Sequence, residues 1–189
     1  NLKDDSENYF PLINIPKADF KLRTEAVFLF HDAGINIEEL LFAEDLELNR
    51  LKENNLLSLV LVDHNKLSSA HLELQNCITG ILDHHGDEKN YPEGIYTDIR
   101  PVGSTATIVS EFFLKEQPGT IKGPVGTLLL GTILLDTVNL DPEAGRVTED
   151  DKKMADELIA ITTLDKDALF SKLQYEKFNV SSLGSYDLL

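Results

Sequence analysis

The stretch "CITGILDHH" (77–85) sets a short apolar run directly before an aspartate and two histidines. The same design occurs earlier in the chain, where "LLSLVLVDHN" (56–65) also ends in an acid followed by a histidine. Continuous apolar runs of this length are typical of parallel strands that are buried on both faces. The two stretches therefore predict two strands of a mostly parallel sheet.

The segments around these stretches alternate between strand-like and helix-like patterns, which favours an α/β fold whose sheet is flanked by helices. Three further strands are expected at 10–15, 40–45 and 96–100. Helices are expected at 24–35, 46–55, 104–117, 124–138, 148–162 and 165–175. The chain shows no internal repeat and no linker, so we expect residues 1–189 to form a single domain.

The composition limits the classes of partner. The 189 residues include 33 acids and 17 bases, which gives a formal charge of −16 at pH 7. This charge repels polyanions, so we expect neither a nucleic-acid surface nor a membrane-binding surface. The apolar stretch 125–138 is too short to cross a bilayer, and residues 1–10 lack the apolar segment of a signal peptide. With Cys77 as the only cysteine, the sequence predicts a reducing, cytoplasmic location.

Polar side chains gather where the two apolar runs end. Because ligands bind at the carboxyl ends of parallel strands, we expect one rim of the sheet to carry Asp63, His64, Asp83, His84 and His85. Side chains alternate along a strand, so Asp83 and His85 should point one way and His84 the other, unless the chain turns after Asp83. Adjacent histidines can then serve different partners.

A third acid, Asp136, lies in the apolar segment "GTILLDTV" (131–138), where an ionised carboxylate needs a partner. Together, Asp63, His84 and Asp136 offer oxygen ligands and one imidazole, a set that suits Mn²⁺, Mg²⁺ or Co²⁺. Two such ions can jointly activate water and neutralise a phosphoryl group. Taken one at a time, a strand-end acid that caps a turn and a hydrogen-bonded histidine are the more common interpretations. The combination favours a metal centre.

The segment "VGSTAT" (102–107) is a candidate phosphate-binding turn. Gly103 lets the backbone approach a ligand closely, and free amides at a helix start, with the Ser104 hydroxyl, can donate to an oxyanion. The alternative is a simple helix N-cap at Ser104, which the spacing alone favours because the segment lacks the length and the lysine of a nucleotide phosphate loop.

The segments "LVLVDHN", "GILDHH", "VGSTAT" and "GTILLDT", in this order, together with "LINIPKADFKLRTE" (12–25), resemble the DHH phosphoesterase superfamily. The resemblance is to the branch of exopolyphosphatases and prune proteins, which is related to family II inorganic pyrophosphatases. It implies a Rossmann-like DHH domain in which Asp63 bridges two divalent metals and His84 and Asp136 complete the shell of the second metal. It also implies that His85 contacts the substrate phosphate and that Asp83 orients the histidines.

The chain departs from the family pattern at both ends. The family begins with a strand that ends in an Asn- or His-led motif with two further aspartates, and no such motif precedes residues 10–15; Asp4 and Asp5 follow no apolar strand. The family also has a basic C-terminal domain, which would begin near "SSLGSYDLL" (181–189). We therefore expect a partial DHH domain that lacks the first strand and the C-terminal domain, with some metal ligands missing.

The function predicted from these residues is a metal-dependent hydrolase of phosphoanhydrides, which releases phosphate from short polyphosphate or pyrophosphate. The predicted catalytic residues are His85 and Asp83, and the predicted substrate-binding residues are His85, Gly103 and Ser104. Two alternatives stay open: a phosphodiesterase that acts on cyclic nucleotides or oligonucleotides, and a non-catalytic, prune-like interaction protein.

Overall fold

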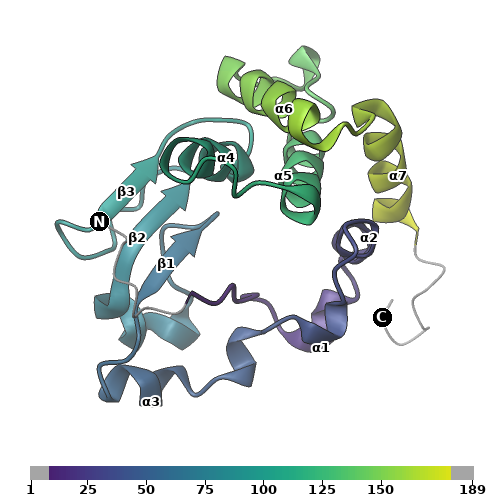
Figure 1. Cartoon of the computed structure of the whole chain (residues 1–189). Coiled ribbons are helices and arrows are strands. Elements are labelled where there is room, and N and C mark those ends of the chain that lie inside the picture. Colours follow the sequence, from purple (N-terminus) through teal and green to yellow (C-terminus); the bar gives the residue numbers. More distant parts are fainter. Residues whose placement is uncertain (1–8, 180–189) are drawn as a thin grey trace.

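The computed structural model of the chain describes residues 9–179. Three parallel strands form a sheet in the order β1-β2-β3, with β1 at Leu59–Val62, β2 at Ile78–Asp83 and β3 at Tyr96–Ile99 (Figure 1). The central strand β2 is buried on both faces apart from Thr79, as its continuous apolar run predicts. The predicted α/β class with a mostly parallel sheet is confirmed.

The predicted helices are present, each with slightly different ends. Their bounds are Thr24–Asp32 (α2), Leu48–Glu53 (α3), Thr105–Glu116 (α4), Gly123–Asp136 (α5), Glu149–Thr162 (α6) and Lys166–Phe178 (α7). Further helices were not predicted: the short helix α1 (Lys17–Phe20) and the 3-10 helices at Ile37–Glu39, Ala43–Asp45, Ser69–Cys77 and Pro142–Ala144. Within the described residues, no helix combines the length and the apolar character that a bilayer crossing requires.

Helix α5 forms the centre of the larger core, with α4, α6, α7 and α2 packed around it (Figure 1). Its residues Leu130, Ile133 and Leu134 are fully buried. Burying each such side chain contributes about 1.5–3 kcal/mol, so this helix accounts for much of the fold's stability. Gly131 has no room for a side chain, because an added Cβ would lie 2.7 Å from Leu29 of α2. Asp136 is the last residue of α5.

Two of the predicted strands are not formed. Residues 10–15 and 40–45 meet in one isolated parallel bridge, between Ile13 and Phe42, and Ala43–Asp45 is a 3-10 helix. The bridge is held by hydrogen bonds from the Ile13 amide to the Leu41 carbonyl and from the Ala43 amide to the Ile13 carbonyl. Among the described residues, neither segment pairs with a strand of the sheet, so the hydrogen bonds between them form a single bridge and do not extend into a ladder.

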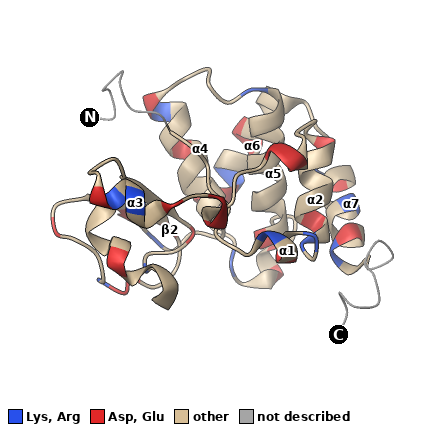
Figure 2. Ribbon diagram, turned by 90° about the horizontal axis from the view of Figure 1, so that it is seen from below, with Lys and Arg blue, Asp and Glu red and all other residues tan. Residues whose placement is uncertain are grey.

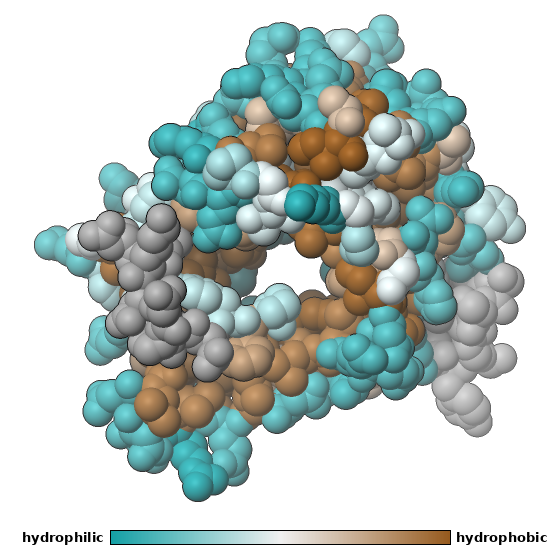
Figure 3. Space-filling model, in the orientation of Figure 1, coloured by the Kyte–Doolittle hydropathy of each residue, from teal (hydrophilic) through white to brown (hydrophobic). Residues whose placement is uncertain are grey.

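The prediction that the 56–65 run is buried on both faces is also wrong. The strand is confined to Leu59–Val62, and Val60 and Val62 are 46% and 44% exposed. Val60 and Val62 lie on the same face of β1 and Leu61, which is buried, lies on the other, so one face of this edge strand is exposed. Figure 3 shows an opening through this face of the molecule with apolar surface along its rim, and Figure 1 places β1 beside it in the same orientation.

Candidate metal centre

Asp63 and Asp83 lie side by side at the carboxyl ends of two neighbouring strands. Val62 pairs with Leu82 in the parallel ladder, and the Asp63 amide continues it by donating to the Leu82 carbonyl at 3.0 Å. Asp63 then adopts a left-handed backbone conformation, with φ at +67°. This conformation is uncommon for a residue with a side chain, although Asp adopts it more readily than most residues do. The Asp63 side chain is 62% exposed at the rim, as predicted.

His84 is oriented for ligation through its Nε2 atom. Its Nδ1 lies 3.0 Å from the Val102 carbonyl, which can only accept, so Nδ1 carries a proton and the neutral form of the ring has its lone pair on Nε2. Nε2 faces Asp63 Oδ1 at 3.5 Å. A hydrogen bond from the far ring nitrogen to a backbone carbonyl is the arrangement found in metal-binding histidines.

Asp83 is fully buried below the histidines and organises both of them. Its Oδ1 accepts from the amides of His84 and His85, at 2.8 and 3.2 Å, and from His85 Nδ1 at 2.8 Å. Burial disfavours the charged form of Asp83, but the hydrogen bonds from His85 and Asn65 outweigh it and lower the pKa of this carboxyl. The hydrogen bond to Asp83 also raises the pKa of His85, against the opposing effect of burial.

The strand ends at Asp83 and the chain turns there, so the side chains of His84 and His85 do not point to opposite faces as residues within a strand would. Both rings approach Asp63, and they contact each other edge to face with centroids 4.4 Å apart. In the part of the chain that the structure describes, Asp63, His84 and His85 each offer a ligand atom, and these atoms all lie within 4.8 Å of one another. This spacing suits donors around a single cation with bonds of about 2.0–2.2 Å.

Asp136 lies next to this group without being part of it. Its Oδ2 accepts from the Ser104 hydroxyl at 2.5 Å. Burial raises the pKa of Asp136 and the Asp63 carboxylate adds to the rise, whereas the Ser104 hydrogen bond and His84 oppose it. Two carboxylates that repel each other beside a histidine lone pair would be stabilised by a divalent cation, so the donor set fits a metal.

Gly103 and Ser104 have protein partners for the groups that were predicted to bind phosphate. The Gly103 amide donates to Asp151 Oδ2 at 2.8 Å, and the Ser104 hydroxyl donates to Asp136. Ser104 also caps α4 by accepting from the Ala106 amide at 3.2 Å, as the N-cap interpretation expects. In this structure the two residues position other groups, and their contact with phosphate stays a prediction.

Three buried residues that were not predicted from the sequence support the site. Asn65 donates to Asp83 Oδ2 at 2.5 Å, and Thr105 donates to Asp63 Oδ1 at 2.8 Å. Asp151 holds Gly103 from the first turn of α6. For Asp151 a signal existed, because Thr148 and Asp151 have the spacing of a capping box.

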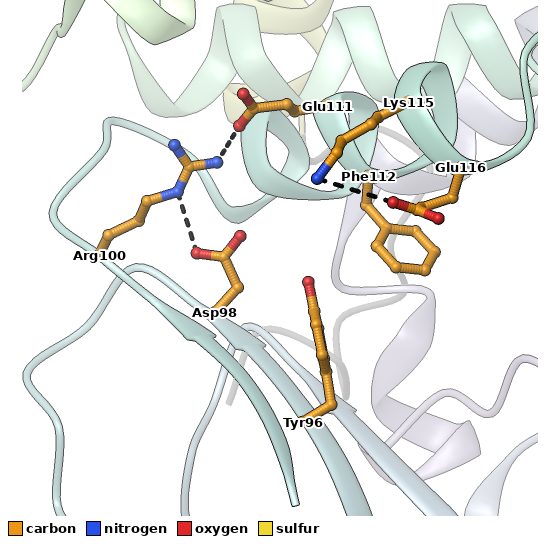
Figure 4. A pocket seen from close by; sticks show the side chains of 7 residues that line it. All are labelled: Tyr96, Asp98, Arg100, Glu111, Phe112, Lys115 and Glu116. Carbon is orange, nitrogen blue, oxygen red and sulfur yellow. Dashed lines mark hydrogen bonds and ion pairs between the residues drawn. The ribbon is translucent and has the colours of Figure 1, made fainter. Parts of the chain in front are cut away.

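A cluster of charged side chains near the end of β3 shares no residue with the candidate metal centre (Figure 4). Arg100 pairs there with Glu111, with Asp98 at 3.0 Å and with Asp150 at 3.1 Å. Three carboxylates neutralise this guanidinium, so Arg100 is not a free cation for an anionic substrate.

Comparison with known proteins agrees with this geometry. No protein-family model matches the sequence. The chain is 33% identical over 183 residues to "Exopolyphosphatase PRUNE1" of Mus musculus, an alignment that covers 96% of this chain and 40% of the mouse protein. It is 37% identical over 125 residues to a Thermotoga maritima protein named as a probable manganese-dependent inorganic pyrophosphatase, which covers 64% of this chain and 22% of that protein.

A solved structure supports the same relationship to inorganic pyrophosphatases. The crystal structure of a Methanococcus jannaschii protein assigned to the family II inorganic pyrophosphatases superposes with a TM-score of 0.67 at 25% identity, covering 88% of this chain and 54% of that one. The chain thus spans about 40% of the length of the mammalian relatives it matches. It belongs to the DHH phosphoesterase superfamily, where it is homologous to the exopolyphosphatases and prune proteins and related to the family II inorganic pyrophosphatases.

Proposed function

We propose that this domain takes part in metal-dependent hydrolysis of phosphoanhydrides, with release of phosphate from short polyphosphate or pyrophosphate. The observation that carries the proposal is the group formed by Asp63, His84 and His85, whose ligand atoms lie within 4.8 Å of one another. The names of the relatives, an exopolyphosphatase and a manganese-dependent pyrophosphatase, support this substrate class and Mn²⁺ or Mg²⁺ as the metal.

Asp63, His84 and Asp136 would hold the metal. When bound, two divalent ions supply positive charge for the phosphate oxygens and make a water molecule more acidic. This charge is needed because acids outnumber bases over the whole chain and Figure 2 shows acidic residues across its helices and loops.

His85 would bind the substrate phosphate. Its Nδ1 is bonded to Asp83, so the proton gained when the ring becomes charged resides on Nε2. The hydrogen bond to Asp83, which raises the pKa of His85, favours this charged form. His85 can then donate from Nε2 to a phosphate oxygen and stabilise the charge that develops there, while Asp83 keeps the ring in place.

Titration with Mn²⁺ by isothermal calorimetry tests the metal centre directly. We expect binding by the unaltered chain and its loss in Asp63→Ala and His84→Ala, with the exposed His31→Ala as a matched control that binds normally. Phosphate release from tripolyphosphate, pyrophosphate and a cyclic nucleotide, each with Mn²⁺, then tests the substrate class. Absence of Mn²⁺ binding would favour an interaction protein, and hydrolysis of the cyclic nucleotide alone would favour a phosphodiesterase.

A further inference from the structure

One short turn contacts all three residues to which metal ligation is assigned. The contacts of this 102–105 turn are His84 Nδ1 to the Val102 carbonyl at 3.0 Å, Ser104 Oγ to Asp136 Oδ2 at 2.5 Å, and Thr105 Oγ1 to Asp63 Oδ1 at 2.8 Å. The three ligands come from the ends of β1, β2 and α5, so the turn is a shared support for groups that are far apart in the sequence. A displacement of the turn would move all three ligands together.

Gly103, the remaining residue of the turn, contacts residues of other segments. Its amide donates to Asp151 Oδ2 at 2.8 Å. An added Cβ would lie 2.7 Å from Asp151 Oδ2, 2.7 Å from Thr137 Cγ2 and 2.8 Å from the Arg146 carbonyl. Such contacts are too short for any side chain, so only glycine allows this approach.

Asp151 makes more hydrogen bonds than the capping of a helix requires. The carboxylate is fully buried and accepts from the amide and the hydroxyl of Thr148, both at 2.7 Å, as part of the capping box of α6. It also accepts from Thr107 in α4 at 2.6 Å and from Gly103 in the turn. One carboxylate therefore ties the starts of α4 and α6 to the 102–105 turn.

We propose that Asp151 is a positioning residue of the metal centre, which acts through the 102–105 turn on His84, Asp136 and Asp63. It contacts none of these ligands itself. The inference rests on the proposed function for the assignment of the ligands, whereas the anchoring of the turn rests on the hydrogen bonds of Asp151 alone.

Asp151→Asn tests the inference with Mn²⁺ as the probe. The amide retains the size of the side chain but replaces one acceptor by a donor, so at least one of the groups that now donate to Asp151 must lose its partner or reorient. We expect the affinity for Mn²⁺, measured by calorimetry, to fall about tenfold, the lower end of the range for residues that orient metal ligands. Gly103→Ala, which disturbs the same clamp from the other side, should weaken Mn²⁺ binding as well.

Asp165→Ala is the matched control, because it removes a carboxylate that caps another helix, α7, and that accepts from the Asp167 and Ala168 amides rather than from the 102–105 turn. It should lower the melting temperature while leaving the affinity for Mn²⁺ within about twofold. If Asp165→Ala and Asp151→Asn weaken Mn²⁺ binding equally, the effect is general destabilisation and the inference is wrong.

A readout without metal separates this inference from the proposed function. In the unaltered chain, ¹⁵N NMR should show the His84 ring with its proton on Nδ1, and in Asp151→Asn it should show a mixture of tautomers. An unchanged His84 spectrum together with unchanged Mn²⁺ affinity would overturn the positioning role. If the unaltered chain failed to bind Mn²⁺ while the His84 spectrum still responded to Asp151→Asn, the proposed metal centre would be refuted and the anchoring of the turn by Asp151 would be supported.

Discussion

Replacement of Asp83 by Asn should destabilise the fold by an amount that its hydrogen bonds determine. Oδ1 accepts three hydrogen bonds, from the two histidine amides and the His85 ring, and Oδ2 accepts one from Asn65. An Asn at this position would keep its oxygen toward the three donors. Its NH₂ group would then face the NH₂ group of Asn65, at a contact that is now 2.5 Å long.

Asn65 cannot relieve this clash by rotating its amide. Its Nδ2 also donates to the Gly86 carbonyl at 3.1 Å, and its Oδ1 accepts from the Glu88 amide at 2.9 Å. One buried donor is left without an acceptor, which costs about 1–3 kcal/mol. The loss of charge weakens the other three bonds but also removes the burial penalty of the carboxylate, and these two effects oppose each other.

Urea denaturation followed by circular dichroism measures this cost. With a slope of about 1–3 kcal/mol per molar urea, the midpoint of Asp83→Asn should fall by about 1 M. The exposed Asp32→Asn is the control and should change stability by less than about 0.5 kcal/mol. In an Asn65→Ala background the clash is absent, so Asp83→Asn should cost at least about 1 kcal/mol less there. Strict additivity of the two changes would refute the reasoning.

Three further predictions concern the site, its anchor and the open edge of the sheet. Thr105→Val removes the hydroxyl that orients Asp63, so Mn²⁺ affinity in a calorimetric titration should fall about tenfold with little change in melting temperature. Burial opposes ionisation of Asp151, but hydrogen bonds from Thr107, Thr148 and Gly103 lower its pKa. The ionised Asp151 therefore contributes its full stabilisation above the usual aspartate pKa of about 3.9, and this contribution is lost as the pH falls through the lower pKa of the folded state. The urea midpoints of the unaltered chain and of Asp151→Asn should converge only at acid pH. Val62→Lys places a charge on the exposed edge strand, so it should reduce self-association, measured by light scattering as the protein is concentrated. Equal scattering by both proteins would show that this strand does not drive self-association.

Much of the local structure could be predicted from the sequence. Residues 78–83 of the predicted run became the central strand because its apolar residues continue on both faces, and the helices α4 to α7 formed in the segments predicted for them. The edge strand β1 shows the limit of this reasoning. Its composition resembles that of β2, yet Val60 and Val62 are exposed, because burial depends on which elements lie beside a strand.

The same division holds for the site. The sequence by itself determined that Asp63, Asp83 and the two histidines meet at one rim, since parallel strands bring their carboxyl ends to the same edge. Only the tertiary structure decided how they are held. The bond from Asn65 to Asp83 spans 18 residues and the bond from Gly103 to Asp151 spans 48. Such partners carry no local pattern, because a buried carboxylate needs donors close in space and the packing of distant elements decides which residues supply them.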